Sequence, residues 1–396
     1  MIRHLITLMW NRRRANALLL AEIFLAFVVL FVVGSVGLFN WRNYQEPMGF
    51  SYDNVWVIDL DAGTQPRADQ FATLQTVLRQ LRSAPGVVSV SRTASNTPFS
   101  GSNNTTWMET EKDGIKQSVE DVNYYEANIE LREVMGVQMR EGRWFDHRDE
   151  TATRTPVVIT QLLRDKLFGP GAPAVGKRIN NREAEWQVVG VSGAYRADGE
   201  LQEPRPAMFV YLSPDDTTRA RNTLLVKVRP GSGAALEKKI SADIRSAGTT
   251  WSSNVRALAE QRLTQFKFGL VLPVILGVVC LFLIINVALG LFGVLWLNIS
   301  RRRGEIGVRR AMGATAGNIS GQVLGEILVL TTFGLVLGLL VAVQFPLLGI
   351  FSVLPSIYFT AMLLAAGVLY LLAVVCALYP SRLAAGIQPA VALREE

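Results

Sequence analysis

The sequence has little cysteine and little histidine. Its 396 residues include two cysteines and two histidines. Both cysteines, Cys280 and Cys376, fall inside apolar runs, so no disulfide is expected in an exposed domain. His4 and His147 lie far apart and on opposite sides of the predicted membrane spans. A histidine-based metal site or catalytic triad is therefore not expected.

Charge is missing from three long stretches. Residues 15–39 contain only Glu22, residues 268–300 contain no charge, and residues 327–381 run for 55 residues without one. Since about 20 residues cross a bilayer as a helix, the third stretch must hold two spans. Two prolines place the break in the turn 346–356. The sequence thus predicts four transmembrane helices, at 15–39, 268–299 (extended by a stalk), 321–345 and 357–379.

The remaining composition indicates a membrane protein with one large soluble domain. Hydrophobic residues make up 49% of the chain and the mean hydropathy is +0.25. These values are too high for an ordinary soluble protein, although 18% of the residues are charged. The first apolar stretch follows basic residues, as in a signal peptide. We interpret it as a retained anchor because it is long and no cleavage site is obvious.

The orientation follows from the basic residues of the short loops. Arginines gather in the amphipathic N-terminal segment 1–14, in the loop 300–320 and in the tail 380–396, which are expected in the cytoplasm. Residues 40–267 then lie outside, with 29 Lys and Arg against 28 Asp and Glu. The net charge of +7 therefore reflects topology, and no nucleic-acid partner is expected.

The outer region alternates strand and helix patterns. Near its start a strand (54–59), a helix (68–84) and a strand (85–92) follow one another, and the same order returns at 222–230, 233–247 and 252–258. Two such β-α-β units predict one α+β subdomain built from 40–103 and 201–267. Residues 104–200 would form an inserted subdomain.

Enzyme motifs are incomplete. The stretch "GAPAVGKR" (171–178) has the glycine and lysine spacing of a phosphate-binding loop but carries Arg178 where Mg²⁺ needs Ser or Thr. The "HRD" at 147–149 has Arg154 where a kinase has its Mg²⁺-binding Asn. We therefore predict a non-catalytic chain with no metal and no cofactor of its own.

Polar and small residues within the spans form a further set of candidates. Glu22 and Glu326 lie towards the cytoplasmic ends of their spans, where pairing with an arginine is favoured over a proton relay. Gly334 and Gly338 have the G-x-x-x-G spacing that permits close helix contact.

The stretch "SRRRGEIGVRRAMGAT" (300–315) is the most informative. Arg301–Arg303 are sufficiently explained as topogenic charges. The continuation predicts a short amphipathic helix, with Glu305 and Arg309 paired one turn apart and Gly313 ending it. Its apolar and charged residues predict a docking surface for a partner, made of Glu305, Ile306, Val308, Arg309, Arg310, Met312 and Gly313.

That stretch closely resembles the R-x-x-E-I-G-[IV]-R-[RK]-A-[LM]-G-A signature of MacB/FtsX-type (type VII) permeases of ABC transporters, here from Arg302 to Ala314. The tail "YPSRLAAGIQPAVALREE" is similar to the family's C-terminal pattern. The segments "GVQMREGRWFDHRD" and "VVITQLLRDKLFGPGAPAVGKRI" look like its periplasmic core.

The resemblance implies a coupling helix that docks on a cytoplasmic ABC ATPase, a ferredoxin-like porter half and an inserted half in the periplasm. It also implies two permease copies, as a homodimer or with a related paralogue, in the inner membrane. Because no valid phosphate loop occurs, ATP is expected to bind a separate subunit.

A mechanism follows from length. The run 268–300 would be about 50 Å long as a helix, against a hydrocarbon core of about 30 Å. It would continue beyond the membrane as a stalk. The resemblance implies that this helix transmits ATP-driven motion to the outer domain (mechanotransmission), for export of peptides, antibiotics or lipids with a periplasmic adaptor and an outer-membrane channel. An FtsX-like regulator of cell-wall hydrolases and a lipoprotein-releasing permease remain alternatives, and a membrane-anchored enzyme is a more distant one.

Overall fold

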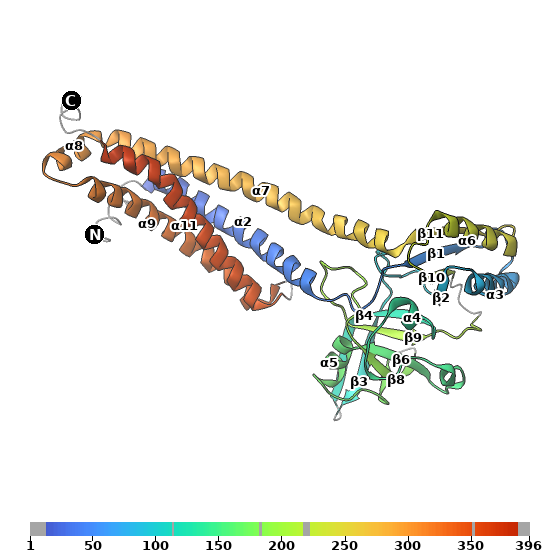
Figure 1. The fold of residues 1–396 in the computed structure, drawn as a ribbon. Helices are drawn as coiled ribbons and strands as arrows, with labels where there is room; N and C mark the ends of the chain where they lie inside the picture. Colours follow the sequence, from blue (N-terminus) through green and yellow to red (C-terminus); the bar gives the residue numbers. More distant parts are fainter. Residues whose placement is uncertain (1–12, 113–114, 182–183, 217–221, 351–352, 387–396) are drawn as a thin grey trace. The chain divides into compact units, whose positions relative to one another are not determined.

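The computed structural model describes residues 13–112, 115–181, 184–216, 222–350 and 353–386. Residues 1–12 of the predicted N-terminal segment and 387–396 of the predicted tail lie outside the described residues. The chain divides into two compact units, Asn43–Gly269 and the combination of Met1–Arg42 with Leu270–Glu396. Figure 1 shows the elements of each unit.

Four helices are long and apolar enough to cross a membrane, as the sequence predicts. They belong to α2 (Arg13–Gln45), α7 (Leu258–Arg301), α9 (Ala316–Ala342) with the short α10 (Gln344–Leu347), and α11 (Pro355–Ala385). The loop between α7 and α9 contains α8 (Arg303–Ala311). With 44 residues, α7 is about 66 Å long, against a hydrocarbon core of about 30 Å, and it begins at Leu258, before the predicted start at residue 268.

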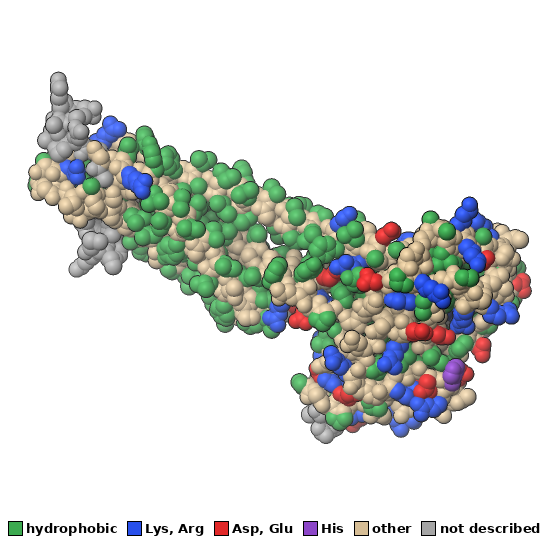
Figure 2. Space-filling view, viewed as in Figure 1, with side chains coloured by type: hydrophobic (Ala, Val, Ile, Leu, Met, Phe, Trp, Pro, Cys, Tyr) green, Lys and Arg blue, Asp and Glu red, His purple; other side chains and the backbone are tan. Residues whose placement is uncertain are grey.

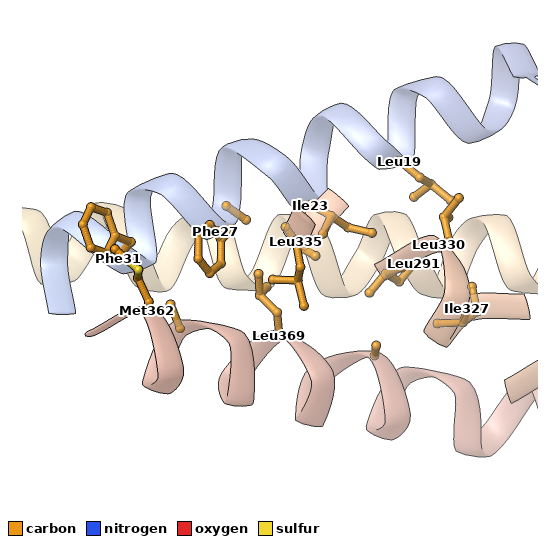
Figure 3. Close-up of a cluster of buried hydrophobic side chains, with 14 of the residues drawn as sticks. Leu19, Ile23, Phe27, Phe31, Leu291, Ile327, Leu330, Leu335, Met362 and Leu369 are labelled. Carbon is orange, nitrogen blue, oxygen red and sulfur yellow. The ribbon is translucent and has the colours of Figure 1, made fainter. Parts of the chain in front are cut away.

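The helical unit is held together by a stripe of apolar residues at four-residue spacing on α2. Leu19, Ile23, Phe27 and Phe31 are all buried and face the other helices (Figure 3). Four residues make slightly more than one turn, so these side chains share one face. Their partners are Leu291 on α7, Ile327, Leu330 and Leu335 on α9, and Met362 and Leu369 on α11.

Gly334 and Gly338, which the sequence predicts at a helix contact, lie where α9 packs against α2. A Cβ on Gly334 would come within 2.7 Å of Ile23, and one on Gly338 within 2.3 Å of Phe27. Both distances are shorter than any real carbon–carbon contact, so α9 can approach α2 this closely only without side chains there.

The outer surface of the helical unit is apolar. Figure 2 shows hydrophobic side chains covering its visible face, with basic residues gathered near the end that carries α8. On α7, Leu272, Phe282 and Leu289 are about 60% exposed or more. Such a surface suits lipid or another apolar helix, and this agrees with a membrane location.

The smaller sheet of the other unit is built from both ends of that unit. Its antiparallel strands follow the order β11 (Ser252–Ala257), β1 (Val55–Asp61), β10 (Thr223–Val228), β2 (Val87–Thr93). The helices α3 (Arg67–Ser83) and α6 (Ala234–Ala247) cover one face through buried residues such as Leu81 and Ile240. Two interlocked β-α-β units in this order form a ferredoxin-like fold, as expected for the porter half.

The larger sheet comes from the inserted segment. Its order is β5 (Met139–Gly142), β8 (Glu185–Ser192), β6 (Thr155–Thr160), β9 (Ala207–Tyr211), β4 (Ile115–Ala127), β3 (Thr105–Lys112), β7 (Arg178–Asn180). Because β7 also pairs with β8, six of these strands close into a ring. The helix α5 (Gln161–Phe168) contributes Leu163 and Leu167 to its apolar core, while the short α4 (Leu131–Met135) contributes to a core shared by the two sheets.

The insertion is longer than predicted. Strand β9 follows residue 200, where we expected the porter half to resume, and it pairs with β4 and β6 of the larger sheet. The inserted subdomain therefore ends near residue 212. The two sheets share one apolar core, in which Val57 and Leu225 of the smaller sheet meet Tyr125 and Phe209 of the larger one.

Candidate functional site

The candidate site is the turn of chain around α8. Helix α7 ends at Arg301, and Arg302, outside helical geometry, separates it from α8. At the other end Gly313 has φ +98°, a conformation that favours glycine, and its N–H donates to the Arg310 carbonyl. Thr315 then caps α9 by accepting a hydrogen bond from the Asn318 N–H. The predicted helix and its glycine stop are both present.

The inner face of α8 is apolar and packed. Ile306 is 8% exposed and lies in a cluster with Ile299 of α7, Ile319 of α9 and Ala384 of α11. We expected Ile306 to offer apolar surface to a partner, and that expectation is wrong because three other helices cover this side chain. Its contribution is to attach α8 to the ends of the spans.

A closed set of polar contacts lies beside this cluster, and we call its members the polar ring: Arg302, Glu305, Arg309, Gln322 and Glu326. The Arg302 guanidinium lies 3.0 Å from one Glu326 oxygen and 3.2 Å from the other. Arg309 donates to Glu305 at 2.6 Å and to the Gln322 carbonyl oxygen at 2.7 Å. Gln322 donates to Glu326 at 3.2 Å, and Arg302 lies 3.8 Å from Glu305. The ring joins both ends of α8 to α9.

The polar ring explains two predicted pairs and includes one residue that the sequence did not reveal. Glu305 and Arg309 pair as expected, and Glu326 has its arginine in Arg302. Gln322 was missed, although it precedes Glu326 by one turn of α9 and so shares its face. Glu22 is not part of the ring. Its carboxylate lies against α7 at Gly290, where a Cβ would come within 2.4 Å of a Glu22 oxygen.

The outer face of α8 is left open by these contacts. Val308 is 43% exposed and Met312 is 77% exposed, and Arg310 between them is partly exposed. Arg301 and Arg303 are also exposed. Of the predicted docking residues, the structure therefore leaves Val308, Arg310, Met312 and Gly313 at the surface, while it turns Ile306 inward and binds Glu305 and Arg309 to their neighbours.

No group of three or more histidine, cysteine or acidic side chains is placed to hold a metal ion in the part of the chain that the structure describes. The segment 171–178 joins the helix α5 to the strand β7. A phosphate-binding loop joins a strand to a helix, so this segment has the opposite order.

Two family models match the chain and together cover most of it. The MacB-like periplasmic core domain matches residues 18–243. The FtsX-like permease C-terminal domain matches residues 274–389, which contain α8 and the polar ring.

The chain matches its curated relatives over only part of the relatives' length. The macrolide export ATP-binding/permease protein MacB 1/2 of Paracoccus denitrificans is 30% identical over 225 residues, 54% of this chain and 33% of that protein. The pyoverdine export ATP-binding/permease protein PvdT of Pseudomonas aeruginosa is 26% identical over 285 residues, 68% of this chain and 42% of its own. The chain thus spans between a third and about two fifths of these relatives.

Among solved structures, the periplasmic region of MacB from Actinobacillus actinomycetemcomitans matches with a TM-score of 0.38 and 14% identity, over 56% of this chain and 97% of that one. The family models together with the four apolar helices decide the classification. Permease components of ABC transporters are typically non-catalytic and work with an ATPase. The chain belongs to the MacB/FtsX-type permease family of ABC transporters and is an inner-membrane protein with a periplasmic α+β domain.

Proposed function

We propose that this chain is a permease subunit that couples ATP hydrolysis by a separate cytoplasmic ATPase to movement of its periplasmic domain. The observation that carries the proposal is the two-sided environment of α8. Its inner face is fixed by Ile306 and the polar ring, whereas Val308 and Met312 are exposed and Arg310 is partly exposed. A helix that is attached on one side and open on the other can receive a force and pass it on.

The docking surface has the mixture of groups that protein interfaces use. Methionine is adaptable and enriched at interface cores, and arginine can fix the register through charge. Because the polar ring contains charge-assisted hydrogen bonds to α9, a partner that pushes on Met312 would displace the ends of the spans together with α8.

Helix α7 is the proposed path of the motion. It begins at Leu258, directly after strand β11 of the smaller sheet, and ends at Arg301 beside α8. One helix therefore connects a periplasmic strand to the docking region without a loop. Closure of the ATPase would move the periplasmic domain mechanically, and no substrate would pass between the spans.

We propose export as the outcome of this motion. The curated relatives are named for macrolide and pyoverdine export, and the match to the MacB-like periplasmic core favours export over hydrolase regulation or lipoprotein release. The proposed complex contains a second permease copy, a periplasmic adaptor and an outer-membrane channel, and its cargo is a peptide, an antibiotic or a lipid.

The test introduces negative charge at two surface positions of the α8 turn, Arg310 and Met312. We expect Arg310→Glu with Met312→Glu to weaken binding of the ATPase that co-purifies with the wild-type chain by about tenfold or more and to abolish stimulated ATP hydrolysis. Loss of one buried apolar anchor and one charge contact is worth at least about 1.4 kcal/mol, a factor of ten. Arg309 is left intact because its reversal would also break the polar ring.

The control is Asn318→Glu, an exposed position in the first turn of α9 where an acidic residue is tolerated. It adds negative charge to the same loop without touching Val308 or Met312, and we expect near wild-type stimulation. If the Arg310/Met312 variant inserts normally and stimulates the ATPase like the wild type, α8 is not the docking site.

A further inference from the structure

The connection between β8 and β9 touches two helices that are distant in sequence. We call residues 193–206 the junction loop. Within the periplasmic unit it contacts the last residues of α2 and the first residues of α7. Both helices continue from there into membrane spans.

The contact with α2 is made by one buried arginine. Arg196 is 3% exposed, and one terminal nitrogen of its guanidinium donates to the carbonyls of Asn43 at 2.7 Å and Glu46 at 2.8 Å. The other donates to the carbonyls of Glu200 at 2.7 Å and Gln202 at 2.8 Å. Four backbone oxygens, two at the end of α2 and two within the junction loop, therefore converge on a single side chain.

Arginine is the residue type that this geometry needs. The last carbonyls of a helix have no partner within the helix and carry partial negative charge, so a cation is favoured there. The planar guanidinium can serve two carbonyls on each side, whereas a lysine ammonium cannot present that fork. Burial lowers the pKa of Arg196, but the intrinsic pKa of arginine is so high that the group stays charged.

The contact with α7 is made a few residues further along the loop. Glu200, 5% exposed, forms an ion pair with Arg262 in the first turns of α7. The Arg262 guanidinium also lies 4.6 Å from the ring centre of Tyr52. The Leu201 side chain packs so closely on Gly269 of α7 that a Cβ there would come within 2.9 Å of it.

The backbone of the junction loop is also fixed against the segment that follows α2. The Arg196 N–H donates to the Met48 carbonyl at 3.1 Å. Gly49 has φ +81°, and a Cβ on it would lie 1.7 Å from the Ala194 carbonyl oxygen. The two stretches of backbone can therefore be this close only because residue 49 is glycine.

We propose that Arg196 and Glu200 are positioning residues that fasten the end of α2 and the start of α7 to one loop, so that both helices move the periplasmic domain as a pair. The junction loop leads directly into β9, which lies between β6 and β4 in the larger sheet. A displacement of either helix would thus reach the centre of that sheet. The transmission part of this inference rests on the proposed function, whereas the fastening part does not.

The first measurement is amide hydrogen exchange on the full chain in detergent micelles. In Arg196→Met we expect the amides of residues 43–48 and 199–203 to exchange at least tenfold faster, with β1 and β10 unchanged. Arg196→Lys keeps the charge without the fork and should lie between this variant and the wild type. Unchanged exchange at 43–48 in Arg196→Met would refute the fastening role.

The second measurement follows the ATP-dependent movement of the periplasmic unit. A fluorophore on Ser102→Cys, at an exposed position before β3, reports ATP-dependent change in the complex with the co-purifying ATPase, after Cys280 and Cys376 are replaced by alanine. In Arg196→Met and in Glu200→Gln we expect ATP hydrolysis within about twofold of wild type but the fluorescence response reduced at least fivefold. A wild-type response in both variants would refute the transmission role.

The matched control is Arg164→Met. Arg164 of α5 is 7% exposed and pairs with Glu141 of β5 and Asp165 of α5, so both of its ion-pair partners lie outside α2 and α7. Its loss should destabilise the periplasmic unit while leaving the ATP response intact, which separates positioning from general stability. If the wild-type complex itself gives no ATP response, the proposed function is wrong and transmission fails with it, while hydrogen exchange still decides the fastening role.

Discussion

Replacing Gly338 by alanine tests the helix packing that holds the membrane unit together. A Cβ at this position would lie 2.3 Å from Cδ1 and 2.9 Å from Cγ of Phe27, which is fully buried. Because Cγ lies near the root of the side chain, the ring cannot swing away by a small rotation. Relief requires α2 and α9 to separate or Phe27 to leave its rotamer, which costs about 1–3 kcal/mol.

The net effect includes a favourable contribution. Alanine stabilises a helix interior over glycine by about 1 kcal/mol, so Gly338→Ala should destabilise by up to about 2 kcal/mol. Gly367 on α11 provides the control, because a Cβ there meets no heavy atom within 4 Å. Gly367→Ala should be neutral or stabilising by up to about 1 kcal/mol. The two variants should differ by about 1–3 kcal/mol in the free energy of unfolding. This difference isolates the clash with Phe27, because the gain in helix propensity is common to both.

The free energy of unfolding is measured from the midpoint of denaturation by sodium dodecyl sulfate in mixed micelles, followed by circular dichroism. Phe27→Leu removes the ring, so combined with Gly338→Ala it should recover at least about 1 kcal/mol relative to additivity. The packing argument fails if Gly338→Ala is as stable as Gly367→Ala, or if the double variant shows no coupling.

Three further outcomes are expected. Leu81→Ala should destabilise the periplasmic unit by about 2–5 kcal/mol in urea, because Leu81 of α3 is fully buried in the core of the smaller sheet and a cavity would remain; a loss below about 1 kcal/mol would contradict this packing. The Glu150 hydrogen bond, the larger cause, raises the pKa of His147 above 6.5. The stabilisation that the His147–Glu150 pair gives the folded protein is thus fully present below pH 6.5 and is lost as the pH rises through the folded-state pKa of His147. Histidine NMR should show that midpoint falling towards 6.5 in Glu150→Gln, and an unmoved midpoint would exclude this pairing. Finally, Ser102→Cys should react with an impermeant maleimide in spheroplasts, since the unit that contains it is periplasmic, and protection would overturn the topology.

The membrane part of the fold was predictable because lipid imposes a simple requirement. In lipid, a long apolar run can satisfy its backbone hydrogen bonds within one segment only as a helix, so the charge-poor stretches predicted the four apolar helices. Turn chemistry located the break before Pro355, which begins α11. The predicted helix ends were less accurate, since α2 continues to Gln45 and the predicted span ended at residue 39. The continuation is more polar, and a span that leaves the membrane as a helix has no sequence break to mark its end.

Helix α8 shows where periodicity stops being informative. At 100° per residue, Ile306 and Val308 lie about 200° apart around α8 and cannot face the same partner. The sequence therefore contains two apolar faces, and nothing in it says which one is covered. Arg309 and Arg310 both lie within about 60° of Ile306, so the angle alone does not distinguish Arg309, which donates to Gln322, from Arg310, which is partly exposed. Distinguishing the faces required knowing that Ile299, Ile319 and Ala384 converge on one of them.

Arg196 was not predictable at all. In the sequence it is one arginine between Tyr195 and Ala197 in a polar stretch, and nothing there distinguishes it from an exposed arginine. Its burial depends on carbonyls about 150 residues earlier in the chain, which no local pattern encodes. The end of the insertion was missed for a similar reason, because β9 is a five-residue strand whose assignment depends on its neighbours β4 and β6.

The split smaller sheet has a consequence for biogenesis. Strand β1 is paired on both sides, with β10 and β11, and about 160 residues separate Asp61 from Thr223. At 5–20 residues per second, synthesis leaves both edges of β1 without partners for roughly ten to thirty seconds. The larger sheet lies wholly within that interval of sequence, so it can fold first and bring the two halves of the smaller sheet together. The insertion thereby shortens the effective loop that β1 must close, which limits the time during which the open edges of an apolar strand can pair with other chains.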